Sequence, residues 1–216
     1  MYSWIESLLG SALFYRSFYS SERFADIPIP PTEDWEAATS AVFPSSFKWS
    51  VDPRTNDLVV GDVRDTFTSN NLAKFECAWE DKVATAFFRG TATGGGVTTE
   101  TNQRLNICNL SHKWKENPPP SCSGVAYLDA AITGWNSRDK KIAGVDMSYI
   151  KTKSFPFTGG KINYVPMYKQ CTYKYLVYVE GHCAACRYGF MMRLGSVIIK
   201  VDSSCVADTM WYFPML

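Results

Sequence analysis

The chain has 216 residues, of which 46% are hydrophobic and 15% aromatic, which is enough apolar material for one large domain or two small ones. Its 22 lysines and arginines nearly balance its 21 aspartates and glutamates, so the formal net charge of +1 provides no basic surplus for tracking a phosphate backbone. We therefore expect a globular protein whose main partner is not nucleic acid.

No apolar stretch approaches the roughly 20 residues that a membrane-spanning helix needs, so we expect no membrane span in this chain. Residues 1–13 include Glu6 and lack a basic start, which does not fit a secretory signal peptide. Seven cysteines, an odd number, leave the redox compartment and the disulfide state open.

The first 80 residues carry mixed signals. Residues 26–31 contain three prolines, which remove backbone donors and favour extended geometry. Thr32 is followed by acidic residues and predicts the start of a helix, and residues 71–79 predict a second, short helix. We interpret residues 1–80 as a partial N-terminal region.

From residue 82 onward, strand patterns alternate with helix patterns. Strands are predicted at residues 82–88, 125–132, 144–150, 174–180 and 196–201, and helices at residues 100–110 and 184–194. This alternation favours a parallel sheet with crossover helices. We expect residues 81–216 to form one α/β domain.

A glycine- and threonine-rich segment follows the strand at residues 82–88. It begins with Arg89, Gly90 and Thr91 and contains three glycines at 94–96. Glycines let backbone N–H groups approach an anion, hydroxyls add donors, and Arg89 or Arg104 can neutralise charge. The segment is neither a Walker loop nor a Gly-x-Gly-x-x-Gly fingerprint, so it indicates either a phosphate cradle or an ordinary surface loop.

A second strand, glycine turn and helix start follow at residues 174–187. The ligand site of an open α/β sheet lies at the carboxyl ends of its strands. Ala184 and Ala185 are small enough to let a nucleotide approach the first helical turn, and Arg187 could reach its diphosphate. Read in isolation, Arg187 could equally be a solvated helix residue and His182 a turn residue.

Four ordered segments resemble the signatures of glycosyltransferase family 90, which includes the Rumi-like protein O-glucosyltransferases and capsule xylosyltransferases. They are residues 88–94, 102–105, 173–187 and 195–200. Residues 26–30, Trp35 and the aromatic residues 211–213 are also similar to that family, so the resemblance extends over residues 24–216.

The resemblance implies a GT-B-like architecture with two Rossmann-type lobes, of which this chain holds mainly the donor-binding lobe and part of the acceptor lobe. It implies inverting, metal-independent transfer of glucose or xylose from a UDP-sugar to a hydroxyl of a protein or glycan, with no cofactor. The absence of an Asp-x-Asp motif agrees with metal independence. The compartment implied is the lumen of the endoplasmic reticulum or Golgi.

The resemblance also implies site residues. Arg89, Gly90, Thr91 and Arg104 would hold the diphosphate, and the turn formed by His182, Cys183, Ala184, Ala185, Cys186 and Arg187 would contact the nucleotide and its phosphates. The family's catalytic base is an aspartate upstream of the segment matched by residues 26–28, so the catalytic residue is unknown here. Asp26 is a conceivable substitute, and we expect the chain to be truncated at both ends relative to the family.

Three alternatives remain open from the sequence. Cys183 and Cys186, spaced as in a thiol oxidoreductase, precede a predicted helix, where a thiol pKa is lowered. The same cysteines with His182 could contribute to a zinc site, although structural zinc sites usually have two such pairs. The chain could also be a sugar-nucleotide-binding fragment that lacks catalysis.

Overall fold

The computed structural model of the protein describes most residues between 69 and 202 and shorter pieces before them. The described residues are 16–17, 27–30, 47–51, 55, 58–63, 69–120, 126–136, 140–142, 145–147, 150–182, 185 and 187–202. The predicted helix start at Thr32 and the conceivable base Asp26 lie outside them, as do Cys183, Ala184 and Cys186.

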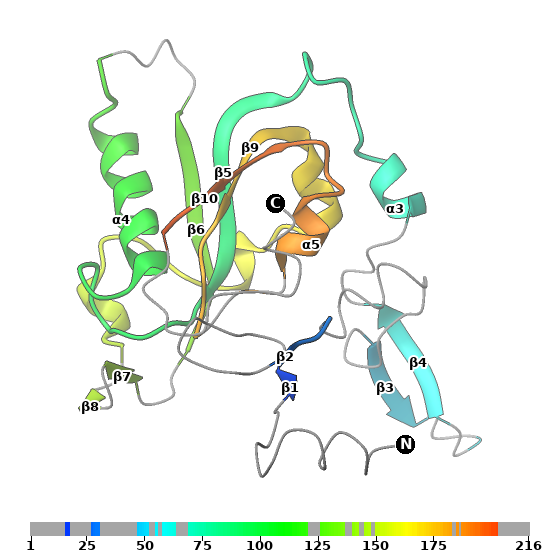
Figure 1. The fold of residues 1–216 in the computed structure, drawn as a ribbon, viewed down its shortest axis with the longest axis horizontal. Helices are drawn as coiled ribbons and strands as arrows, with labels where there is room; N and C mark the ends of the chain where they lie inside the picture. Colours follow the sequence, from blue (N-terminus) through cyan, green and yellow to red (C-terminus); the bar gives the residue numbers. More distant parts are fainter. Residues whose placement is uncertain are drawn as a thin grey trace, which may run out of the picture.

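A four-stranded parallel sheet forms the centre of the described structure (Figure 1). Its strands, from one edge to the other, are β10 (Val197–Lys200), β9 (Tyr173–Tyr178), β5 (Val83–Ala92) and β6 (Leu128–Trp135). Every neighbouring pair is parallel, which confirms the predicted parallel sheet and gives a mixed α/β, Rossmann-like arrangement.

The order in which the chain adds strands to the sheet reverses at β5, so β6 and β9 lie on opposite sides of it. The chain passes from β5 to β6 on one side, then crosses back to place β9 on the other side of β5 and β10 beyond it. In open α/β sheets, ligands bind at such a switch point, at the carboxyl ends of the strands. The fold therefore predicts that a ligand site lies at the residues that follow β5 and β9.

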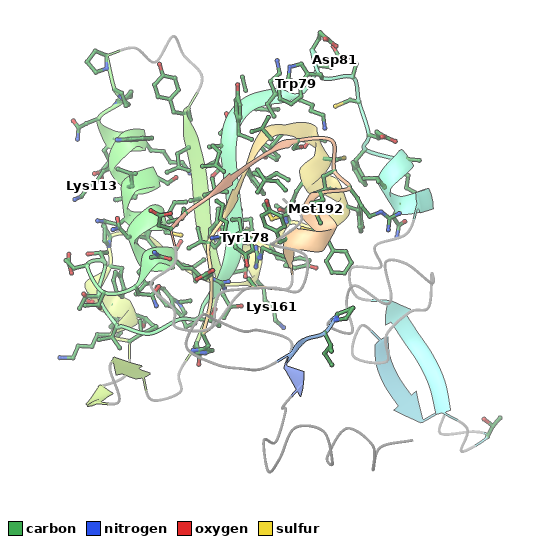
Figure 2. The ribbon with its side chains drawn as sticks, viewed as in Figure 1. Trp79, Asp81, Lys113, Lys161, Tyr178 and Met192 are labelled. Atoms are coloured by element: carbon green, nitrogen blue, oxygen red, sulfur yellow. The ribbon has the colours of Figure 1, made fainter. Side chains whose placement is uncertain are left out.

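Helices α4 (Gln103–Glu116) and α5 (Arg187–Met191) cover opposite faces of the sheet. Successive strand residues point to opposite faces, so Phe88 packs with Leu105 on α4 while Phe87 packs with Met191 on α5. Figure 2 shows Tyr178 in the interior beside the sheet and Lys113 on the outer side of α4. Each helix thus closes its own hydrophobic core.

Asn102 defines the start of α4. Its side-chain oxygen accepts hydrogen bonds from the N–H groups of Arg104 and Leu105, so it is the N-cap, and the helix begins three residues later than the predicted 100–110. The helix then continues to Glu116 with Lys113 and Lys115 in its last turn, where cations favour the dipole.

Helix α5 is shorter than the predicted 184–194. After Met192, whose N–H still bonds to the carbonyl of Tyr188, the backbone tightens, and Arg193 and Leu194 bond to carbonyls only three residues earlier. Gly189 lies inside the helix and lowers its stability. Gly195 has φ +58° and ends the tightened turn that follows the helix.

Strand β5 is longer than predicted. It was expected to end at residue 88, but it continues to Ala92 because its pairing with β6 persists to Ala92 opposite Trp135. Arg89, Gly90 and Thr91 are therefore strand residues, and the glycine-rich loop begins only at Thr93. Strand β6 also extends beyond its predicted end, from residue 132 to Trp135. The sequence did not predict this extension, because Gly134 is typical of a turn.

The remaining elements are short and pair locally. They are strands β1 (Arg16–Ser17), β2 (Ile27–Pro28), β3 (Phe47–Val51), β4 (Leu58–Val63), β7 (Lys140–Ile142) and β8 (Val145–Met147), helix α3 (Ser69–Ala73), and 3-10 helices at Thr152–Ser154, Lys161–Asn163 and Met167–Thr172. The strand predicted at 144–150 is confirmed in part by β8, which is shorter and, in the described residues, pairs with β7 in a separate two-stranded sheet. The helix predicted at 71–79 is α3, which ends earlier.

Within the described residues, no helix is both long and apolar enough to cross a membrane.

An ion pair joins β5 to β6 on the face that α5 covers. The Arg89 guanidinium donates to the Asp129 carboxylate at 2.8 Å and to the Asp129 carbonyl at 2.9 Å, and it lies 4.3 Å from the centre of the Phe87 ring. Lys115 donates to the other carboxylate oxygen at 3.3 Å. Burial acts to raise the pKa of Asp129, but the hydrogen bond and charge of Arg89, with Lys115, outweigh it and lower that pKa.

Replacing Asp129 by asparagine keeps the shape and removes the charge. We expect the free energy of unfolding near neutral pH to fall by about 1–3 kcal/mol, the range for losing hydrogen bonds to a charged group. Because the pKa of Asp129 is lowered in the folded state, this contribution is present above the unfolded pKa and is lost as the pH falls through the folded value. Urea unfolding should show the difference shrinking below about pH 4.

Asp81→Asn is the matched control, because Asp81 is exposed just before β5 (Figure 2). This variant should unfold like the wild type at both pH values. A loss in Asp129→Asn that stays constant at low pH would contradict an electrostatic role for Asp129.

Candidate functional site

The Arg104 side chain joins the carboxyl ends of β5 and β9. It is 5% exposed, and its guanidinium donates to the carbonyls of Glu180 at 2.8 Å, Val179 at 3.0 Å and Thr91 at 2.9 Å. It also donates to the Thr93 hydroxyl at 2.6 Å. A permanent positive charge is therefore fixed at the switch point of the sheet.

Gly90 lies where two guanidinium groups converge. A Cβ atom on Gly90 would lie 3.1 Å from Nη2 of Arg187 and 3.5 Å from Nη1 of Arg104, and 2.9 Å from Cζ of Phe88. The Phe88 ring is 5.8 Å from the Arg104 guanidinium carbon and 5.5 Å from that of Arg187. Arg187 also donates from Nη1 to the carbonyl of Arg89. Only glycine leaves room for both guanidiniums here.

The glycine-rich loop is attached to the start of α4 by Asn102. The Asn102 side chain is 3% exposed, and while its oxygen caps the helix, its Nδ2 donates to the carbonyls of Thr93 at 3.1 Å and Gly96 at 3.2 Å. Gly94 and Gly96 have φ values of +110° and +46°, which side-chain-bearing residues rarely adopt. One amide thus positions both the loop and the helix that carries Arg104.

A β-bulge shapes the end of β6. Gly90 pairs with Ile132 but Thr91 pairs with Gly134, so Thr133 is the extra residue, and Trp135 comes to lie opposite Ala92. The Trp135 ring lies nearly parallel to Phe155 at 5.7 Å and Phe157 at 6.3 Å. Bulges often re-aim side chains, and the three rings here pack against the hydrophobic core on the α4 face of the sheet.

Asn136 and His182 meet at the same edge of the sheet. Asn136 directly follows β6 and is 8% exposed, and its Nδ2 lies 3.0 Å from Nε2 of the exposed His182, which follows β9. Between them lies the end of β5. Gly181 packs closely against this end, since a Cβ there would lie 2.7 Å from the Thr93 hydroxyl.

The structure brings together several residues that the sequence singled out. They are Gly90, Thr91, Arg104, His182 and Arg187, all at the carboxyl ends of β5 and β9 or just beyond them. The Arg89 side chain is held by Asp129, and Ala185 donates from its backbone to the Tyr178 hydroxyl at 2.7 Å. Ligand contacts by any of these residues remain predictions.

Sequence reasoning overlooked the roles of Asn102, Trp135 and Asn136. An asparagine before a helical pattern is an N-cap signal, so the role of Asn102 could have been found. Trp135 and Asn136 carried no local signal, because their placement depends on the bulge and on the pairing of β6 with β5.

The described residues contain no group of three or more histidines, cysteines, aspartates or glutamates placed to hold a metal ion. Cys77, Cys108 and Cys171 are free thiols, and burial raises the pKa of Cys108 to about 12, so that this thiol stays protonated. The Cys183 and Cys186 pair, on which the thiol and zinc hypotheses depend, lies outside the described residues.

The fold and site define a Rossmann-like α/β unit with two arginines at its switch point, and the sequence comparisons agree with that class. The model of glycosyl transferase family 90 matches residues 21–207. The chain therefore belongs to glycosyl transferase family 90.

Three viral and human proteins are similar to this chain in sequence. Uncharacterized protein 179R of Invertebrate iridescent virus 6 is 30% identical over 213 residues, which covers 93% of this chain and 17% of that protein. Uncharacterized protein 027R of Frog virus 3 is 35% identical over 128 residues, 56% of this chain and 12% of that protein. Human protein O-glucosyltransferase 3 is 30% identical over 129 residues, 58% of this chain and 19% of that protein. The chain thus spans less than a fifth of each of these three relatives.

Asn102→Ala removes both the helix cap and the two loop contacts. We expect the free energy of unfolding to fall by at least about 2 kcal/mol, since a lost cap and two buried carbonyls left without their donor each contribute. Asn102→Asp retains a capping oxygen but loses the donors, so stability should fall less while amide exchange in residues 93–98 accelerates. Denaturant titration and hydrogen exchange measure the two effects.

Asn106→Ala provides the control, because Asn106 is exposed on the same helix. Its stability should stay within about 0.5 kcal/mol of the wild type. Equal stability of the Asn102→Ala and Asn106→Ala variants would show that Asn102 does not organise the loop.

Proposed function

We propose that this chain is the donor-binding part of a glycosyltransferase that moves a sugar from a UDP-sugar to a hydroxyl acceptor. The convergence of Arg104 and Arg187 on Gly90, at the switch point of the sheet in a family 90 chain, carries the proposal. A diphosphate is the ligand that suits two guanidiniums beside a glycine best, because they supply fixed positive charge and the glycine leaves the backbone uncovered.

The proposed reaction is an inverting displacement. The acceptor hydroxyl attacks the anomeric carbon, a base takes its proton, and the bond from that carbon to the diphosphate oxygen breaks, so that UDP leaves with the electron pair. Negative charge grows on the diphosphate as the bond breaks. Arg104 and Arg187 supply fixed positive charge there, which is the role that a metal ion has in other transferases, and we propose transfer without a metal.

Family membership and the name of one relative guide the choice of sugar. Human protein O-glucosyltransferase 3 is a glucosyltransferase by its name, so glucose is the first donor to test, with xylose as the second. The acceptor is proposed to be a hydroxyl of a protein or glycan. Because the chain spans only 19% of that relative, the activity, substrates and partners of the whole protein are proposals as well.

Arg187→Ala tests the site. We expect the affinity for UDP and for UDP-glucose to fall by about 10- to 100-fold, the effect of losing a charge-assisted hydrogen bond to phosphate. Isothermal titration calorimetry of the chain with UDP, UDP-glucose and UDP-xylose, each with Mg²⁺ and with EDTA, measures the affinities. Equal affinities in Mg²⁺ and EDTA are expected.

Arg193→Ala is the matched control, since Arg193 is an exposed arginine just after α5. Its affinities should remain within about twofold of the wild type, as for a surface charge away from the ligand. If Arg187→Ala binds UDP as tightly as the wild type, the site is misassigned. If the wild type binds neither UDP nor a UDP-sugar, the proposed function fails.

A further inference from the structure

The contact between Asn136 and His182 spans the end of β5. Neighbouring strands lie about 4.8 Å apart, so β6 and β9, which flank β5, are separated by about 10 Å. Asn136 follows the first of these strands and His182 follows the second, yet their side chains approach to 3.0 Å. The pair therefore forms a polar bridge over the edge of the sheet where the candidate site lies.

The bridge joins an amide to an imidazole. With Nδ2 of Asn136 as the donor, Nε2 of His182 is the acceptor, which corresponds to the neutral tautomer that carries its proton on Nδ1. Neutral groups that both donate and accept are suited to hydroxyls, whereas guanidiniums are suited to phosphates. Asn136 is buried and His182 is exposed, so one end of the bridge is fixed and the other faces solvent.

The neutral bridge adjoins the cationic part of the site through Gly181. A Cβ atom on Gly181 would lie 3.3 Å from Nη2 of Arg104, and His182 is the next residue in the chain. A ligand whose phosphates lie against the arginines would therefore present the groups attached to those phosphates to Asn136 and His182. In a nucleotide sugar, these attached groups are two rings that carry adjacent hydroxyls.

We propose that Asn136 and His182 form a subsite for the vicinal hydroxyls of the donor, supplied by either its ribose or its sugar. This assignment rests on the proposed function, because it takes the arginines to hold a diphosphate. His182 acts as a specificity-determining residue at the open end of the subsite, and Asn136 fixes the tautomer and orientation of its ring.

The test compares inorganic pyrophosphate, UDP and UDP-glucose. UDP adds a nucleoside to the diphosphate, and UDP-glucose adds the sugar as well. Calorimetry measures each with the wild type, His182→Ala and His182→Gln. We expect His182→Ala to lose about three- to tenfold in affinity for a hydroxyl-bearing ligand, as for one neutral hydrogen bond, with pyrophosphate binding unchanged. His182→Gln, which retains a neutral donor and acceptor, should recover part of the loss.

The pattern across ligands identifies the source of the hydroxyls. An equal loss for UDP and UDP-glucose assigns the subsite to the ribose, and a loss for UDP-glucose alone assigns it to the sugar. The proposal is overturned if His182→Ala leaves all three affinities unchanged, or if it weakens pyrophosphate as much as the other two, because the bridge would then be only a structural latch.

His112→Ala is the matched control. It removes the other of the two histidines in the chain, which lies on α4 with Nε2 3.4 Å from a carboxylate oxygen of Glu116, and all its affinities should match the wild type. A wild type that binds pyrophosphate but neither nucleotide would refute the proposed function itself. Nucleotide binding that is indifferent to His182 would refute only the subsite.

Discussion

The described structure depends on one buried guanidinium. Beyond the last paired residues of β5 and β9, Arg104 donates from α4 to the carbonyls of Thr91, Val179 and Glu180. It is 5% exposed, so this one group ties the helix to the ends of both strands, while Asn102 holds the glycine loop. Because an arginine keeps its charge in any protein environment, the same interaction that holds the fold together also makes the edge of the sheet electropositive.

Polar groups of two kinds lie near this charge. Two guanidiniums flank Gly90, and the hydrogen-bonded pair of Asn136 and His182 lies beyond Gly181. Trp135, which lies opposite Ala92 at the end of β6, packs against Phe155 and Phe157. These groups belong to a family 90 chain that spans less than a fifth of each of the three relatives compared.

The sequence predicted the sheet better than it predicted the site. Runs of apolar, β-branched and aromatic residues beside glycine turns predicted β5, β9 and β10 from local pattern alone. The position of Arg89 could not be found in this way, because whether β5 ends before or after it depends on pairing with residues 40 positions away. Likewise, the glycine-rich segment indicated either a phosphate cradle or an ordinary loop, and the bulge before Trp135 could not be predicted because it depends on the pairing of β6 with β5. The predicted helix at 184–194 was too long because the backbone tightens after Met192 and turns at Gly195, while the apolar pattern continues to Leu194.

Phe87 and Phe88, each 1% exposed, fill separate cores on the two faces of β5. A strand with one wet face resists slipping by one residue, since a slip would expose its apolar side chains. Strand β5 is buried on both faces around these two residues, and a one-residue slip would bring Ala86 into the core that Phe87 fills or Arg89 into the core that Phe88 fills. Polar contacts oppose the same slip: Arg89 pairs with Asp129 on β6, and the buried ammonium of Lys82, the residue before β5, donates to the carbonyls of Cys171 and Leu194. Charged residues in and beside the central strand therefore act together with its phenylalanines to select one register during folding.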